Sequence, residues 1–212
     1  MKDSPPETLV ELLTGLRLGT AAEVQGVSGR ARRLAGDLPL FESLWIDALA
    51  QARLLTPWQA AEITAGRGSA LRVGPFVLYE RLAKCGYAML YRAREIDARD
   101  FVRLTIATGK VDVADAKRRL ALLVDKADQL AGAPLWPVVR QGTDGERLWA
   151  ASDWFVGRTA RQWMMGHGRF PPASVHEIAS RMLVGLAACE RAGVPHADLG
   201  VDRLWFGTQG QL

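Results

Sequence analysis

The sequence predicts an α+β protein in which a small all-helical unit precedes a five-stranded antiparallel sheet and a second helical region. Three observations support this prediction. Apolar residues recur at helical spacing in the first part of the chain, the pattern changes to strands joined by short turns from residue 75, and helical spacing returns after residue 155. The predicted domains are residues 1–68, 72–154 and 155–212.

The helical unit is predicted from helix-start signals and one apolar stripe. Residues 4–7 and 56–59 each place a hydroxyl residue three positions before a glutamate or glutamine, which is the pattern of a capping box. Residues 18–38 are rich in glycine and carry a weaker helical pattern. A single helical face is formed by apolar residues at positions i, i+3, i+4, i+7, i+8 and i+11: Phe41, Leu44, Trp45, Ala48, Leu49 and Ala52.

The middle of the chain predicts the sheet. Its segments rich in Val, Leu, Tyr and Phe indicate three consecutive strands at residues 75–82, 88–95 and 100–107. Residues 112–131 then predict one amphipathic helix. The last two strands are expected at residues 138–141 and 147–153, with residues 142–145 (Gly-Thr-Asp-Gly) as the hairpin turn.

The last part of the chain predicts two helices and a loop. Residues 158–165 indicate a short helix. A third capping box at residues 174–177 predicts the start of a longer helix that ends at Gly193, and the loop that follows begins near His196.

The composition excludes several classes of protein. Two cysteines without a CxxC spacing and three histidines argue against a zinc site or a disulfide framework and favour a cytoplasmic location. No apolar run is long enough for a membrane span, and the first residues lack the apolar core of a signal peptide. The net charge of +4 includes two basic clusters, residues 30–33 and 117–119, for which a solvated helix face is favoured over a nucleic-acid surface.

Three motifs in order resemble those of bacterial serine/threonine protein kinases. Residues 73–93 (VGPFVLYERLAKCGYAMLYRA) are similar to the family's GPYxLxxxLGxGGMGxVYxA opening. Residues 101–106 (FVRLTI) fall at its V-A-[LIV]-K strand, and residues 196–205 (HADLGVDRLW) fall at its H-R-D-L-K-P-x-N loop. Residues 54–59 (LLTPWQ) also resemble the lead-in of large kinase-like proteins of Planctomycetes-type bacteria. The resemblance covers about residues 72–206 and implies a kinase-like N-lobe, with the helix after the third strand as its αC helix. It also implies the start of a C-lobe, comprising the hinge, two helices and the catalytic loop.

The resemblance also implies that the glycine-rich loop is degenerate. Ala83, Cys85 and Ala88 stand at its three glycine positions, and an additional glycine, Gly86, is retained. The added methyl and thiol groups reduce the close approach of backbone N–H groups to a nucleotide phosphate. Lys84 could supply a cation from this turn, although the equivalent position usually faces solvent in the family.

The lysine and glutamate that position nucleotide phosphates are replaced as well. Thr105 stands at the position of the family's lysine, and Arg103 stands where a small residue normally packs on adenine. An arginine there would fill the nucleotide pocket or need a partner of its own. Val124 and Asp125 lie where the predicted helix should offer a glutamate, and residues 112–131 contain none.

The catalytic-loop motif keeps one of its polar residues. Asp198 matches the family's catalytic base, although an aspartate there can also accept structural hydrogen bonds, and His196 is expected to be a packing residue. Gly200 replaces the loop's lysine. Arg203 replaces the asparagine that would bind magnesium, so it places a positive charge where a cation should bind.

These replacements predict a pseudokinase, a catalytically inactive kinase-like module that acts in signalling or scaffolding through contact with a protein partner. Binding of ATP and magnesium is doubtful, no metal site is expected, and no membrane contact is expected. Two alternatives stay open. One is an atypical serine/threonine kinase or ATP-binding protein that uses Asp198, and the other is a basic nucleic-acid-binding domain.

Overall fold

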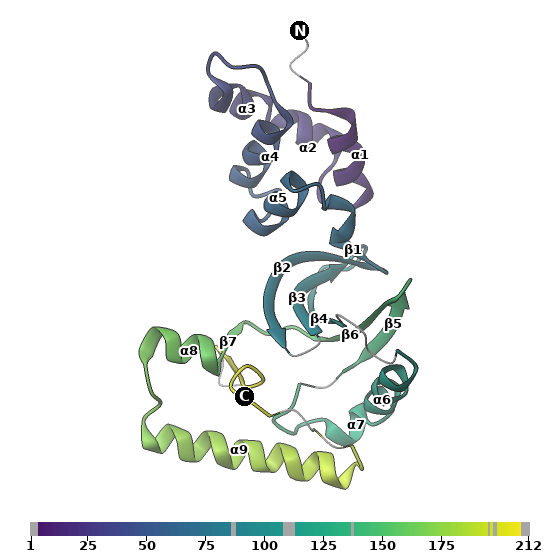
Figure 1. Cartoon of the computed structure of the whole chain (residues 1–212), viewed down its shortest axis with the longest axis vertical. Coiled ribbons are helices and arrows are strands. Elements are labelled where there is room, and N and C mark those ends of the chain that lie inside the picture. Colours follow the sequence, from purple (N-terminus) through teal and green to yellow (C-terminus); the bar gives the residue numbers. More distant parts are fainter. Residues whose placement is uncertain are drawn as a thin grey trace. The chain divides into compact units, whose positions relative to one another are not determined.

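The computed structural model describes residues 4–85, 88–107, 113–136, 138–194, 196 and 199–208 (Figure 1). Contacts within the chain separate two compact units. The first contains residues 1–81 with 91–101, and the second contains residues 82–90 with 102–212. The domain boundaries expected at residues 68 and 154 stay predictions.

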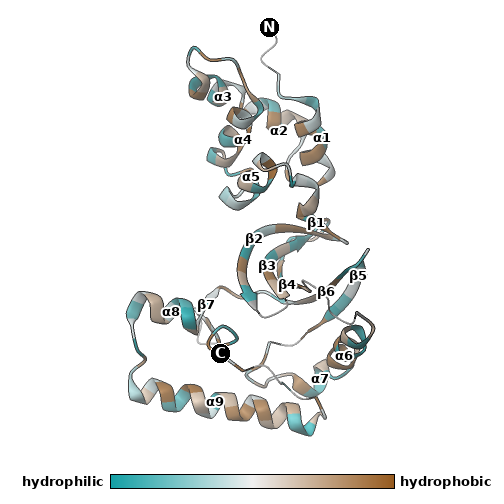
Figure 2. Cartoon of the chain, viewed as in Figure 1, coloured by the Kyte–Doolittle hydropathy of each residue, from teal (hydrophilic) through white to brown (hydrophobic). Residues whose placement is uncertain are grey.

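The N-terminal part of the first unit is all-helical, as the apolar stripes predict. Its core is formed by buried aliphatic side chains and Trp45, and the hydropathy colouring of Figure 2 shows apolar residues spread over these helices. The elements are α1 (Glu7–Gly15), α2 (Ala21–Gly26), α3 (Ser28–Ala35), α4 (Glu42–Gln51), α5 (Pro57–Thr64) and the 3₁₀ helix η1 (Gly68–Leu71).

The start of α1 contradicts one predicted capping box, and the start of α2 contains a capping box that was not predicted. The capping box predicted at residues 4–7 is wrong, because α1 begins after Pro6 and has no side-chain cap. The glycine-rich region contains a capping box that was not predicted from the sequence. Thr20 and Glu23 cap each other at the start of α2, and these bonds hold the pKa of Glu23 below its usual value.

The capping box at Thr56 and Gln59 is confirmed, and it also ties α5 to strand β2 (Phe76–Cys85). Within the box, Gln59 Oε1 accepts from the Thr56 N–H at 2.9 Å and Thr56 Oγ1 accepts from the Gln59 N–H at 3.1 Å. The remaining donors point to the strand: Thr56 Oγ1 donates to the Tyr79 carbonyl at 2.7 Å, and Gln59 Nε2 donates to the Leu78 carbonyl at 2.8 Å. Because Gln59 is fully buried, its two side-chain bonds satisfy an amide that water cannot reach.

The antiparallel sheet has the predicted strands and one short addition. Its order is β1-β2-β3-β4-β6-β5, so β6 lies between β4 and β5. The hairpin turn is shorter than predicted, because Gly142 already pairs with Trp149 and the chain reverses at Gly145, which has a φ of 58°. The strands other than β2 are β1 (Arg72–Val73), β3 (Ala88–Glu95), β4 (Phe101–Ala107), β5 (Arg140–Asp144) and β6 (Arg147–Asp153).

The helix predicted at residues 112–131 is interrupted near its end. It forms α6 (Val113–Asp125) and a short α7 (Ala127–Leu130), with Lys126 between them. Leu130 packs with Ala188 and Cys189 of α9 (Pro172–Arg191) in a small buried cluster. Burial raises the pKa of the Cys189 thiol, so this cysteine stays neutral.

Both predicted C-terminal helices are present, but their starts differ from the prediction and the shorter one ends at His167 rather than at residue 165. The third capping box is wrong, because α9 begins after Pro171 and has no side-chain cap. A capping box that was not predicted joins Thr159 and Gln162 at the start of α8 (Ala160–His167). Strand β7 (Gly157–Thr159) pairs with β8 (Trp205–Gly207). Across the described part of the chain, no helix combines the length and apolarity that a membrane crossing requires.

The joint between α5 and β2 predicts a pH-dependent effect of Gln59→Glu. In its ionised form the new carboxylate would lose the donor to the Leu78 carbonyl, so we expect the variant to be destabilised at pH 7 by more than about 3 kcal/mol. Burial raises the folded-state pKa of the new carboxyl above its unfolded value. The protonated acid regains a donor, so the loss should be smallest below about pH 4 and grow as the pH rises through the folded-state pKa. Urea unfolding of the variant and the original chain at several pH values measures this loss of stability.

Gln162→Glu is the matched control for that variant. Gln162 occupies the same position of a capping box but is exposed, and a carboxylate in the first turn of a helix is favourable. We expect a change of about 0.5 kcal/mol or less at neutral pH. Equal losses in the two variants would contradict the structural role assigned to Gln59.

Candidate functional site

Strand β4 presents its two candidate residues on one face. Side chains alternate along a strand, so Arg103 and Thr105 share a face while Leu104 and Ile106 are buried on the other. The register with β6 places Ser152 opposite Arg103 and Ala150 opposite Thr105. Both candidate side chains are half-buried.

The Arg103 guanidinium is held by three neighbouring groups. Its carbon lies 3.8 Å from the centre of the Trp136 ring, a distance at which a cation is attracted to the face of an indole. One terminal nitrogen donates to Ser152 Oγ at 3.2 Å and to the Trp136 carbonyl at 3.4 Å. Because arginine stays charged, these contacts replace part of the hydration that the cation loses.

Trp136 belongs to an aromatic cluster that also contains Trp154, Phe155 and Trp205. Its ring centre lies 4.2 Å from that of Phe155 and 5.2 Å from that of Trp205. The Trp136 indole N–H donates to the Asp153 carbonyl at the end of β6, which fixes the ring's orientation. Gly157 permits the approach of Trp205, because a Cβ at this position would lie 2.5 Å from the Trp205 indole nitrogen.

A cavity of about 290 Å³ adjoins this cluster. Its walls are mainly apolar and come from α6, α7, α9, the segment before β5 and the segment after α9. Arg103, His196 and Arg203 are its charged or titratable members besides Cys189. Among the described residues, no group of three or more His, Cys, Asp or Glu side chains could hold a metal ion.

The structure places the glycine-loop residues at the facing ends of β2 and β3. Ala83 is half-buried and Lys84 is exposed near the end of β2, while Ala88 begins β3 and is half-buried. Cys85 is the last residue of β2, and its side chain is outside the described part. Gly86 lies outside the described residues.

The loop after α9 contributes a second arginine to the cavity. Arg203 is half-buried and its N–H donates to the Gly200 carbonyl at 2.8 Å in a turn. The neighbouring Asp202 accepts from Arg161 of α8 at 2.6 Å, a bond that lowers the pKa of Asp202. His196 lines the cavity but is exposed, and Asp198 lies outside the described residues.

Helix α6 offers no acidic group to this cavity among its described side chains. Leu123 lines the cavity, Val124 is half-buried and Asp125 is exposed. Asp115 pairs instead with Arg118 and Arg119 on the exposed surface of the same helix.

Trp136, Ser152 and Trp205 contact Arg103 or line its cavity, but none of them was predicted from the sequence to belong to the site. The predicted hairpin and strand order could have found Ser152, because they put the end of β6 beside β4. No signal of comparable strength located Trp136, since it lies in an irregular segment before β5.

Comparison with known proteins identifies bacterial serine/threonine-protein kinases among the relatives of this chain. No family model matches the chain. It is 25% identical over 146 residues to the serine/threonine-protein kinase PknL of Mycobacterium tuberculosis, covering 68% of this chain and 36% of the relative. It is 23% identical over 139 residues to the probable serine/threonine-protein kinase PkwA of Thermomonospora curvata, covering 66% of this chain and 19% of that relative. The chain therefore spans about a third or less of these relatives.

Solved structures share the fold. The kinase domain of M. tuberculosis PknI superposes with a TM-score of 0.54 at 17% identity, covering 65% of this chain and 56% of that one. Rad53 in complex with AMP-PNP superposes with a TM-score of 0.50 at 19% identity, covering 60% of this chain and 33% of that one. The chain is protein kinase-like. Its sheet and following helices correspond to a kinase N-lobe and part of a C-lobe, so the predicted fold class is confirmed.

The stack of Arg103 on Trp136 in this kinase-like domain predicts energetic coupling between the two side chains. In a double-mutant cycle of Arg103→Met and Trp136→Leu, we expect a coupling energy of about 0.5–2 kcal/mol in urea unfolding. A cycle of Arg103→Met with Trp149→Phe is the control, because Trp149 lies on the opposite face of the sheet, across from Ile106. Its coupling should stay below about 0.5 kcal/mol. Equal coupling in both cycles would contradict a specific stack.

Proposed function

We propose that this chain is a pseudokinase module that does not bind ATP and magnesium productively and acts through contact with a protein partner. The observation that carries the proposal is the placement of Arg103. The family resemblance aligns this residue with the small side chain that packs on adenine, and its guanidinium lies 3.8 Å from the centre of the Trp136 ring. The space that adenine needs would therefore be taken by a cation and the indole that binds it.

The residues aligned with phosphate and metal contacts support the same proposal. Thr105 is neutral and shorter than the lysine that it replaces, and α6 has no glutamate to position such a lysine. Arg203 adds a positive charge at the aligned magnesium ligand. Phosphoryl transfer depends mainly on positioning and charge neutralisation, so these replacements would remove the interactions that catalysis requires.

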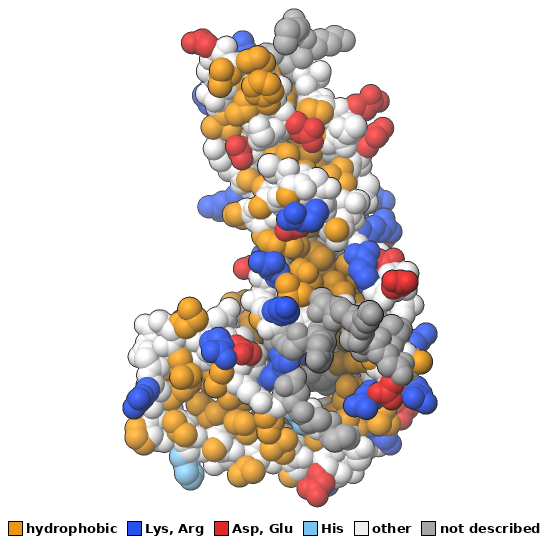
Figure 3. All heavy atoms as spheres, viewed as in Figure 1, with side chains coloured by type: hydrophobic (Ala, Val, Ile, Leu, Met, Phe, Trp, Pro, Cys, Tyr) orange, Lys and Arg blue, Asp and Glu red, His pale blue; other side chains and the backbone are white. Residues whose placement is uncertain are grey.

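The surface of the second unit supports a role in protein contact. Large apolar side chains are exposed on α8 and α9, including Met165 at 82%, Leu183 at 65% and Val184 at 56%. Figure 3 shows apolar atoms gathered over these two helices. Contiguous apolar surface of this kind is typical of interaction sites.

The proposal predicts that ATP with magnesium leaves the melting temperature of the chain unchanged. A ligand that binds the folded state alone must stabilise it, so a thermal-shift titration detects binding without assuming catalysis. In the variant Arg103→Ala with Thr105→Lys, the adenine space is vacated and a phosphate cation is restored. We expect this variant to gain about 1 kcal/mol of stability when the nucleotide exceeds its Kd roughly fivefold.

The single variant Thr105→Lys is the control for that pair, because it restores the cation and leaves Arg103 in place. It should resemble the original chain. A nucleotide-dependent rise in the original chain would contradict the proposal. ATP hydrolysis or phosphoryl transfer that disappears in Asp198→Asn would instead establish the atypical-kinase alternative.

A further inference from the structure

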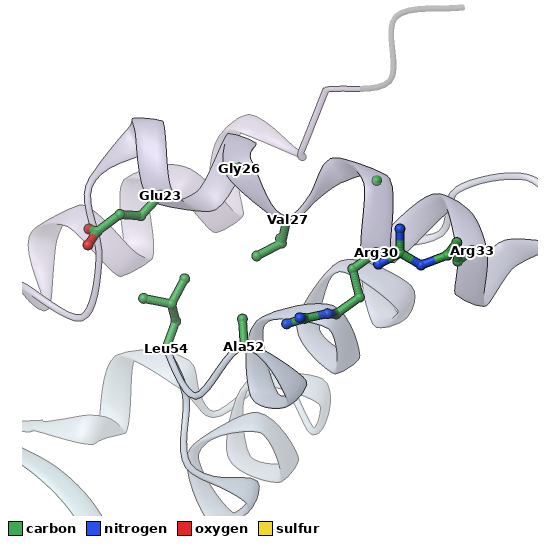
Figure 4. Close-up of a pocket in the computed structure, with 8 residues that line it drawn as sticks. Glu23, Gly26, Val27, Arg30, Arg33, Ala52 and Leu54 are labelled. Carbon is green, nitrogen blue, oxygen red and sulfur yellow. The ribbon is translucent and has the colours of Figure 1, made fainter.

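We propose that the helical part of the first unit binds a short acidic peptide segment of a partner protein in a groove between α2, α3 and the turn after α4. This groove, called here the α3 groove, has a volume of about 480 Å³. Figure 4 shows the residues that line it: Glu23, Gly26, Val27, Gly29, Arg30, Arg33, Ala52 and Leu54. The inference deepens the proposed function, since it names a kind of partner and a further contact surface besides the exposed apolar faces of α8 and α9.

The floor of the α3 groove is aliphatic. Val27 is buried, Ala52 and Leu54 are half-buried, and Val27 and Leu54 point into the open space in Figure 4. Such a floor suits one aliphatic side chain of a bound segment.

Two glycines keep the wall of the groove open without a structural requirement. Neither Gly26 nor Gly29 has a positive φ. A Cβ at Gly26 would meet nothing within 4 Å, and one at Gly29 would meet the flexible end of Arg33 at 3.8 Å. Gly26 ends α2 and Gly29 lies in the first turn of α3, and packing within the described chain does not require glycine at either position. Their missing side chains leave room for a ligand.

Arg30 and Arg33 supply positive charge at one end of the α3 groove. They lie three residues apart on α3 and so project from the same side of the helix. The helical part of the unit is not basic as a whole: residues 1–70 contain seven Lys and Arg against eight Asp and Glu. The positive charge is therefore local, and guanidinium groups form paired hydrogen bonds with carboxylates.

Glu23 sets the direction in which an acidic segment would lie. It lines the other end of the groove, where its carboxylate accepts bonds from the Thr20 N–H at 2.8 Å and the Thr20 hydroxyl at 2.9 Å. These bonds hold a negative charge in place, so carboxylates of the partner are directed toward Arg30 and Arg33.

The groove fits an acidic peptide better than a nucleic acid. Nucleic-acid surfaces rely on several phosphate contacts and on aromatic side chains for base stacking, whereas this groove offers two arginines and aliphatic groups. Leu34, Leu38 and Phe41, which follow on the chain, are exposed at 39%, 61% and 56%.

Fluorescence anisotropy with the full chain tests this inference. The probe is a short labelled peptide with two glutamates followed by leucine, and a glutamine version and a duplex DNA serve as comparison probes. We expect the acidic peptide to bind with a Kd in the micromolar range, and Arg30→Gln and Arg33→Gln each to weaken binding about fivefold. Gly29→Glu should abolish binding by placing a carboxylate beside Arg33, while helix stability is maintained because the added charge lies in the first turn of α3.

Arg32→Gln is the matched control. Arg32 is exposed on the same helix, carries the same charge and does not line the groove, so its loss should change the Kd by less than about twofold. The inference would be overturned if the acidic peptide did not bind, if the glutamine version bound equally well, or if DNA bound more tightly. It would also be overturned if Arg32→Gln and Arg33→Gln had equal effects. A failure of the peptide to bind would not change the outcome of the nucleotide titration, so that titration still tests the proposed function separately.

Discussion

A permanent positive charge in a half-buried, mostly apolar site is the constraint on which the second unit depends. The Arg103 guanidinium cannot lose its proton, so the fold must offer it groups that replace water. Ser152 is supplied by the neighbouring strand, and the carbonyl and indole of Trp136 come from the segment before β5. Trp136 is oriented in turn by the Asp153 carbonyl and by contacts with Phe155 and Trp205. The strand pairing, the segment before β5 and the aromatic cluster therefore depend on one another.

The contact between α5 and β2 satisfies buried polar groups in the first unit in a similar way. A helix whose first turn packs against a sheet must find partners for its own first N–H groups and for any strand carbonyls that it covers. Thr56 and Gln59 do both, because each side chain bonds once within the cap and once to β2. Burying an amide at this position is tolerated because its bonding capacity toward the cap and the strand is used.

The sequence was sufficient to predict the strands and the longer helices, because the residue patterns that indicate them are local. The strand-forming composition between short turns predicted β3 at residues 88–95 and β6 at residues 147–153, which are their observed bounds. Helix starts were harder to predict. Residues 4–7 and 174–177 contain the capping pattern, but α1 begins directly after Pro6 and α9 directly after Pro171, without a side-chain cap. The site was predicted in part. Arg103 could be singled out by the family motif, whereas Trp136 and Trp205 come close to it through contacts distant in sequence. Such contacts leave no periodic pattern.

A crystal structure of the chain grown with saturating AMP-PNP and magnesium tests most directly whether Arg103 and Trp136 occupy the space that adenine takes in a kinase. We predict the guanidinium still stacked on the indole, with no nucleotide between β4 and the aromatic cluster. A nucleotide bound there, with Arg103 displaced from Trp136, would contradict it.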